Sequence, residues 1–303
     1  MVCGAPPLTR RDLGRMTALP ATPAQMRILI FLTLVLACFG SACSRTLDSG
    51  GEETNSASQL PQPPEPREGM IQIPAGTFLA GANERLFQFY LAQSKMNFSG
   101  MAEALRKQFR IPPRPIDLPG FYIQEFEVTN REFKDFIDAT GYRPLDDKNY
   151  LAHWELATYP EWATEFPVVW VSVNDAENYC QWRQGFLPSE DQWEKASRAA
   201  TGSAFPWGNE APGPETSNFG RDQAEPVGNR SGDVSPFQVY DLGGNVREWT
   251  SSLTVVNGSE YRIIRGGSFA LPARDTLSAL RHYQIARSSE ARMADVGFRC
   301  SSN

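Results

Sequence analysis

One stretch of the chain carries most of the information about its fold: Tyr240-Asp241-Leu242-Gly243-Gly244-Asn245-Val246-Arg247-Glu248-Trp249-Thr250. Two glycines, which can adopt positive φ or let another backbone approach closely, stand between the carboxylates Asp241 and Glu248. Such a turn can direct several oxygens, including that of Asn245, at one point, and Ca²⁺ takes oxygen ligands at about 2.3–2.6 Å. The alternative is an ordinary Gly-rich turn leading into a strand, with Trp249 in the core and both carboxylates solvated.

The composition limits the classes of protein to consider. The chain has 303 residues, 41% of them hydrophobic, enough for one large domain or two small ones. Its net charge of −6 is spread along the sequence without a basic run, which argues against nucleic acid as a partner. The only two histidines are His153 and His282, too few for a site of three imidazoles in one chain. The 24 glycines, 23 prolines and seven tryptophans indicate a loop-rich fold with large aromatic anchors.

The first 43 residues have the pattern of an export signal. An apolar run over residues 28–39 follows arginines at positions 10, 11, 15 and 27 and precedes Gly40-Ser41-Ala42-Cys43. The run is too short to span a bilayer, and its flanks are those of a signal peptide, with Met26 as an alternative start. Cys43 looks like the lipid acceptor of a bacterial lipoprotein. The alternatives are an ordinary cleaved signal or cleavage before Cys38, and in each case the remainder is exported to the cell envelope.

Residues 44–68 predict a disordered tether. They contain much Ser, Pro and Glu and almost no large apolar residue. Such a segment buries too little surface to offset its ordering entropy. At this length it would hold the following domain roughly tens of ångströms from a membrane.

The folded domain is predicted over residues 69–303. Residues 70–81 predict two strands around a turn, residues 85–111 an inserted helical segment, and residues 121–128 a strand. The pattern of Thr129 and Glu132 is a capping box, which starts a helix that ends at Gly141.

Two more helices are expected before residue 202. Residues 168–171 predict a strand, after which Ser172 or Asn174 caps a helix with Tyr179 and Cys180 on its buried face. Ser189 follows Pro188 and begins a third capped helix. Residues 203–301 predict turns and short strands, without a helical period longer than two turns.

Nine short motifs follow one another in a fixed order along residues 69–301. They are Ile73-Pro74-Ala75-Gly76, Glu127-Val128-Thr129-Asn130, residues 167–171, Asp175-Ala176 with Tyr179-Cys180 and Trp182, Leu187-Pro188-Ser189-Glu190 with Trp193-Glu194, Phe205-Pro206-Trp207-Gly208, Gly244-Asn245-Val246-Arg247-Glu248-Trp249, Arg265-Gly266-Gly267-Ser268-Phe269, and Gly297-Phe298-Arg299-Cys300. In this order they resemble the formylglycine-generating enzyme family, the sulfatase-modifying factors. The resemblance implies a C-type-lectin-like α+β fold with little regular secondary structure, stabilised by calcium.

The resemblance also implies two calcium sites. Matching motif positions place the first site's ligands at Asp241, Gly244, Val246 and Glu248. The second site's ligands are similarly placed at Asn218, Phe219, Asp222 and Ala224. Calcium is therefore the expected cofactor.

Cys180 and Cys300 are the only cysteines after the leader. An oxidising compartment and a cysteine on a buried helix face favour a disulfide, and the family resemblance implies a bridge between these two positions. Two free buried thiols are the alternative. A closed loop with about 119 residues between its ends would stabilise the fold by roughly 4 to 5 kcal/mol in the chain-entropy model.

The cysteine pair that binds copper in active family members is absent. Alignment on Ala286-Arg287 puts Ala279 at the second cysteine position and Arg274 near the first, and no cysteine lies between Cys180 and Cys300. Because Cu(I) requires soft thiolates, copper binding and the family's reaction, oxidation of a sulfatase cysteine to formylglycine, are not expected.

Two functions follow from these residues. The first is a non-catalytic, membrane-anchored lipoprotein that binds a peptide, glycan or protein partner or has a structural role. The alternative is an oxidase or maturation enzyme with altered metal chemistry that uses His282, Tyr283 or a partner's metal. His282 alone is more often a structural residue.

Overall fold

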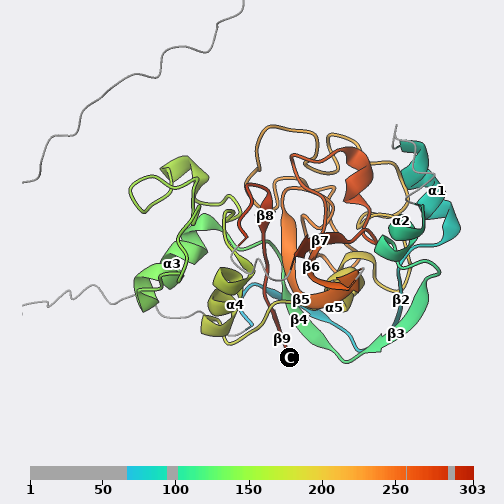
Figure 1. Cartoon of the computed structure of the whole chain (residues 1–303), viewed down its shortest axis with the longest axis horizontal. Helices are drawn as coiled ribbons and strands as arrows, with labels where there is room; N and C mark the ends of the chain where they lie inside the picture. The colour runs from blue at the N-terminus through green and yellow to red at the C-terminus, as the bar shows by residue number, and fades with distance from the viewer. Residues whose placement is uncertain (1–66, 94–101, 257, 286–290) are drawn as a thin grey trace, which may run out of the picture. The chain divides into compact units, whose positions relative to one another are not determined.

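The computed structural model describes residues 67–93, 102–256, 258–285 and 291–303 (Figure 1). The predicted leader, Cys43 and nearly all of the tether lie outside these residues, as do residues 94–101 and Arg287. In the part of the chain that the structure describes, no helix is long and apolar enough to cross a membrane.

In the described part of the chain the strands form three small sheets. The first sheet has the order β1 (Met70–Ile73), β4 (Phe121–Gln124), β9 (Ser301–Ser302). The second sheet pairs β2 (Gly76–Ala80) with β3 (Arg114–Leu118). The third sheet has the order β7 (His282–Ile285), β6 (Ser259–Arg265), β5 (Arg247–Val256), β8 (Val296–Gly297). In the first sheet β4 lies between both ends of the domain, because Ile123 is opposite Ile71 on one side and Ser301 on the other.

The third sheet positions the turn at residues 240–250. β5 pairs with β6 as an antiparallel hairpin and with the short β8 in parallel. The parallel pairing places Arg247 opposite Val296 and Glu248 opposite Gly297. The Gly-Asn-Val-Arg-Glu-Trp motif therefore lies beside the Gly-Phe-Arg-Cys motif near the end of the chain.

The three predicted helix starts are confirmed. Helix α3 (Asn130–Thr140) begins with a capping box between Thr129 and Glu132 and ends at Gly141, whose φ of 68° suits a residue without Cβ. Helix α4 (Val173–Trp182) is capped by Ser172 rather than by Asn174, and α5 (Glu190–Arg198) by Ser189. Local side-chain hydrogen bonds thus fix where each helix enters the domain.

Three sequence expectations are wrong in detail. The strand predicted over residues 121–128 ends at Gln124. Residues 168–171 form no strand: Val168 donates to the carbonyl of Val128, but Trp170 has a φ of 56°, which breaks the extended backbone. Val168 and Val171 are buried in the apolar cluster that also contains residues of α3, α4 and β5. Residues 203–301 contain longer strands than expected, with ten residues in β5 and seven in β6.

The predicted inserted segment contains two helices, α1 (Glu84–Gln93) and α2 (Ala102–Gln108), at one edge of the domain in Figure 1. Their buried residues Phe87, Tyr90 and Leu105 join Phe109 in one apolar cluster. A larger cluster around α3, α4 and β8 contains Phe133, Tyr179, Phe298 and both cysteines, and a third surrounds Trp193. Aromatic side chains thus make up much of the core, while the helices and strands around it are short.

Candidate functional site

The turn before β5 is buried and tightly packed. Asp241 and Asn245 both have positive φ, 59° and 61°. A Cβ on Gly244 would lie 2.2 Å from the Oγ of Ser217 and 2.5 Å from the carbonyl oxygen of Asn218. The glycine is therefore required by the close approach of the loop at residues 217–218.

Glu248 is fully buried at the start of β5. Its Oε1 accepts a hydrogen bond from Nη2 of Arg299 at 2.8 Å. Its Oε2 accepts one from Nε of Arg299 and one from Nε1 of Trp193, both at 2.8 Å. A bidentate guanidinium and an indole N–H thus hold this carboxylate in place.

Three more carboxylates are buried around this ion pair. Burial, and next the charge of Asp241, raises the pKa of Glu127 well above its usual range. Neither side-chain oxygen of Glu127 has a hydrogen-bond partner among the described residues. Burial raises the pKa of Asp233 to about 7 and that of Asp241 to about 6. Four carboxylates against the single guanidinium of Arg299 leave an excess of negative charge that favours a cation or bound protons.

The arrangement fits the first predicted calcium site only in part. The charge suits a cation, and Oδ2 of Asp241 accepts from the backbone N–H of Gly228 at 2.6 Å. Glu248 does not fit as a calcium ligand in this arrangement, because both of its oxygens are held by Arg299 and Trp193. Among the described residues, no group of three or more His, Cys, Asp or Glu side chains is arranged to hold a metal ion. Calcium at this turn stays a prediction.

The second predicted site offers one free ligand. Asn218 is 1% exposed, and its Oδ1 has no hydrogen-bond partner in the described part of the chain. Its Nδ2 donates to the carbonyl of Gln223 at 3.2 Å, which holds the oxygen in the loop that also contains Asp222 and Ala224. Asp222 is exposed and Ala224 half-buried. An orphaned amide oxygen is a hard ligand, so this loop fits calcium better than the first turn does.

The predicted disulfide is present between Cys180 and Cys300, whose Cα atoms are 5.5 Å apart. It joins α4 to the segment before β9 and lies in the largest apolar cluster. The bridge therefore ties the end of the chain to the centre of the domain.

The position that the family resemblance assigns to the second cysteine is buried. Ala279 is 1% exposed and packs in the cluster that α1 and α2 form with Phe87, Phe109 and Leu280. Arg274 lies in a short 3-10 helix (Ala273–Thr276) and is half-buried. The inserted helices thus contribute to the apolar cluster that contains Ala279, the residue that the family resemblance puts at the second cysteine position.

Both histidines are neutral structural residues. Burial, together with the positive charges of Arg247 and Arg265, lowers the pKa of His282 to about 3. His153 hydrogen-bonds Oδ1 of Asn130 at 2.9 Å, and burial lowers its pKa to about 4. Tyr283 pairs with Ile263 in the sheet, while its side chain lies outside the described residues.

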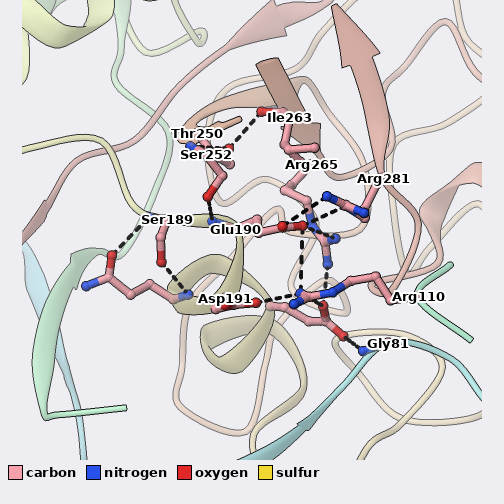
Figure 2. Close-up of polar contacts among 12 residues, drawn as sticks. Gly81, Arg110, Ser189, Glu190, Asp191, Thr250, Ser252, Ile263, Arg265 and Arg281 are labelled. Carbon is pink, nitrogen blue, oxygen red and sulfur yellow. Dashed lines mark hydrogen bonds and ion pairs between the residues drawn. The ribbon is translucent and has the colours of Figure 1, made fainter. Parts of the chain in front are cut away.

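A cluster of arginines and carboxylates at the start of α5 was not predicted from the sequence (Figure 2). Its seven members are Arg110, Arg198, Arg265, Arg281, Glu190, Asp191 and Glu194. Nε of Arg281 lies 2.7 Å from Oε2 of Glu190, and Nη2 of Arg265 lies 3.0 Å from Oε2 of Glu194. The four guanidinium groups exceed the three carboxylates by one positive charge.

Sequence reasoning could not bring this cluster together. The arginines come from the segment after α2, from α5, from the end of β6 and from the loop before β7. The sequence contains one signal of the cluster: the spacing of Glu190, Glu194 and Arg198 places them on one face of α5.

Three small sheets, three capped helices and a buried turn that pairs with the last motif of the chain define the α+β fold of formylglycine-generating enzymes. A family model described as the Sulfatase-modifying factor enzyme 1-like domain matches residues 56–303. The chain belongs to this family.

Related proteins include active and inactive members. The inactive C-alpha-formylglycine-generating enzyme 2 of Bos taurus is 29% identical over 242 residues, 63% of this chain and 80% of that protein. The formylglycine-generating enzyme of Mus musculus is 25% identical over 301 residues, 77% and 75% of the two chains. The hercynine oxygenase of Mycobacterium tuberculosis is 33% identical over 204 residues, 53% of this chain and 48% of that protein.

Solved structures share the fold. PvdO from Pseudomonas aeruginosa has a TM-score of 0.59 at 22% identity, over 77% of this chain and 94% of that one. CarF has a TM-score of 0.54 at 16% identity, over 77% and 97%. At these identities the likeness shows the fold alone.

Proposed function

We propose that the protein is an exported lipoprotein, anchored in the cell envelope through Cys43, whose formylglycine-generating enzyme-like domain binds a partner without catalysing a reaction. The observation that carries the non-catalytic part is the environment of Ala279. The sequence has no cysteine between Cys180 and Cys300, and Ala279, which the resemblance puts at the second cysteine position, is buried in the apolar cluster to which α1 and α2 contribute. The family's reaction has neither its reagent nor access for a substrate at this position.

The alternative of an enzyme with altered metal chemistry has less support. A metal ligand needs an accessible lone pair, and the Nε2 atom of His282 is buried. A single imidazole is also a poor replacement for two thiolates. The relatives include a protein named as inactive, in keeping with a non-catalytic member.

The anchoring part of the proposal rests on the sequence. The charged start, short apolar run and small residues before Cys43 are those of a lipoprotein signal, and a Ser/Pro/Glu-rich tether follows. The membrane is then one partner through the lipid, and the envelope of a bacterial cell is the location.

The purified full chain tests the non-catalytic part. We expect copper and iron contents well below one atom per chain after incubation with each metal. We also expect no change in a cysteine-containing sulfatase peptide by mass spectrometry, with an active formylglycine-generating enzyme as the control. Conversion of the peptide's cysteine to the aldehyde by this chain would overturn the proposal.

A further inference from the structure

A groove of about 920 Å³ lies between α2 with its following segment and the β5–β6 hairpin. Cationic side chains dominate its polar lining: Lys107, Arg110, Arg114 and Arg281, against Glu103 and Glu190. Lys107 and Arg114 are exposed. The groove thus presents more positive than negative charge to any occupant.

The floor of the groove adds to this charge. Arg110 and Arg281 belong to the cluster in which four guanidinium groups face three carboxylates (Figure 2). Arg265 is fully buried beneath them, and its Nε and Nη1 atoms have no hydrogen-bond partner among the described residues. Arg265 is itself paired with Glu194 at 3.0 Å and with Glu190 at 3.8 Å. The excess of one positive charge therefore belongs to the cluster as a whole, and it favours the approach of an added carboxylate.

One wall of the groove is an open strand edge. Leu253, Thr254 and Val255 of β5 line it. On one side these residues pair with β6, whereas β8 pairs only with Arg247 and Glu248 on the other. No described strand pairs with the outer edge of β5 beyond Glu248, but the backbone N–H of Ser251 donates to the carbonyl of Pro188 at 3.0 Å. The free part of this edge among the described residues is therefore the stretch from Leu253 to Val255. Alternate residues of an antiparallel strand direct N–H and C=O groups away from the partner, so this edge offers hydrogen bonds to an added strand.

Apolar side chains accompany the edge. Leu253 is 46% exposed and Val255 is 66% exposed. Strand addition takes its affinity from main-chain hydrogen bonds and its specificity from pockets for alternate side chains. An extended peptide could pair along β5 and extend acidic side chains to the cationic floor.

We propose that this groove binds an extended peptide segment that carries Asp or Glu side chains. Its main chain pairs with the outer edge of β5, and a carboxylate lies near Arg110 and Arg281. The inference rests on the proposed binding function and deepens it by naming the site and the class of ligand. A neutral peptide lacks the matching charge, and a polyanion without a peptide backbone cannot use the strand edge.

Binding of three labelled peptides to the full chain tests the ligand class. The first is an octapeptide of alternating Thr and Glu; the second has Gln for every Glu; the third is the Glu peptide N-methylated at two consecutive residues. Consecutive residues face opposite sides of a strand, so one blocked amide faces β5 in either register. We expect the Gln and N-methylated peptides to bind about tenfold more weakly. Equal binding of the Gln peptide or of the N-methylated peptide would overturn the proposal.

A pair of matched variants tests the place. Lys107→Gln combined with Arg114→Gln should weaken binding of the Glu peptide by about tenfold, because both exposed charges line the groove. Arg143→Gln combined with Arg221→Gln removes the same charge from exposed positions outside it and should change Kd by less than about twofold. Equal effects of the two double variants would contradict a specific groove.

The outcome separates this inference from the proposed function. Formylglycine formation together with binding of the acidic peptide would reject only the non-catalytic role. Absence of turnover together with absence of peptide binding would reject only the groove.

Discussion

Glu248 and Arg299 are the two residues whose pairing holds the centre of the domain. Both are fully buried, and Arg299 also donates to the carbonyls of Gln124, Glu125 and Tyr240. Removing one member of a buried pair costs far more than removing an exposed pair, because the remaining charge stays without compensation. The pair therefore connects β4, β5 and the end of the chain through electrostatics rather than through regular structure.

Arg299→Met should lower the free energy of unfolding by about 3–5 kcal/mol. The matched control is Arg262→Met, which removes an ion pair with Glu177 at 3.5 Å whose side chains are 19% and 33% exposed. The control should cost less than about 1 kcal/mol. Urea titrations with the disulfide intact measure both values, and a similar small cost for the two variants would contradict a buried pair.

The orphaned oxygen of Asn218 gives the calcium prediction its residue-scale test. If calcium binds this loop, free calcium near 100 Kd should stabilise the fold by about 2.7 kcal/mol, and a chelator should lower Tm. Asp222→Asn should remove most of this response, because it takes away the one exposed carboxylate of the predicted site. Asp147→Asn, also at an exposed carboxylate, should leave the response intact. If the chelator leaves the Tm of the unsubstituted protein unchanged, the prediction of a calcium site is refuted.

At the scale of elements, α1 and α2 contribute to the apolar cluster that contains Ala279. Phe87 on α1 is 1% exposed and meets Phe109 edge to face with ring centroids 5.8 Å apart. Phe89 on the same helix is only half-buried. The inserted helices are thus part of the apolar core at this end of the domain.

Phe87→Ala should cost about 3–5 kcal/mol, the cost of deleting a core phenylalanine. Phe89→Ala should cost clearly less, because much of its ring surface remains in contact with water in the folded state. Thermal unfolding of the two variants under one condition measures the difference. Equal and small costs would mean that α1 does not seal Ala279, and the structural support for the non-catalytic proposal would be lost.

The elements that the sequence predicted best are those fixed by local chemistry. The capping boxes at Thr129 and Ser189 need only a hydroxyl and a partner three residues later, so spacing alone identified both helix starts. The strand predicted over residues 168–171 was wrong because an apolar run indicates burial but does not indicate strand pairing. Trp170 has a positive φ, which interrupts the extended backbone there. No pattern in the sequence predicted this conformation.

The candidate sites were less predictable because they depend on distant residues. Asp241 and Glu248 carry the spacing of a cation-binding turn, yet Glu248 is held by Arg299, 51 residues further along. Arg110 and Arg281 come from opposite ends of the domain sequence and meet at the first turn of α5. Only the tertiary fold creates such contacts, so the groove and its charge could not be read from periodicity.

At the scale of the whole molecule, the chain has three predicted parts with different physical roles. In the proposed function, the leader directs export, the tether keeps the domain away from the membrane, and the domain binds a partner. The start and end of the domain meet at β4, and the disulfide ties Cys300 to α4. A change near Cys43 should therefore alter the location of the protein without altering the stability of the domain.

Cys43→Ser in a bacterial host that processes lipoproteins should move the protein from the membrane to the soluble fraction, because the predicted acyl chains provide its anchor. The mass of the mature chain should lose the contribution of the lipid, and Tm should stay unchanged because the tether separates Cys43 from the domain. Cys38→Ser is the matched control: it lies inside the predicted signal, so anchoring should persist. Continued membrane association of Cys43→Ser would reject the acylation site, whereas release by Cys38→Ser would place the processed cysteine five residues earlier and lengthen the tether accordingly.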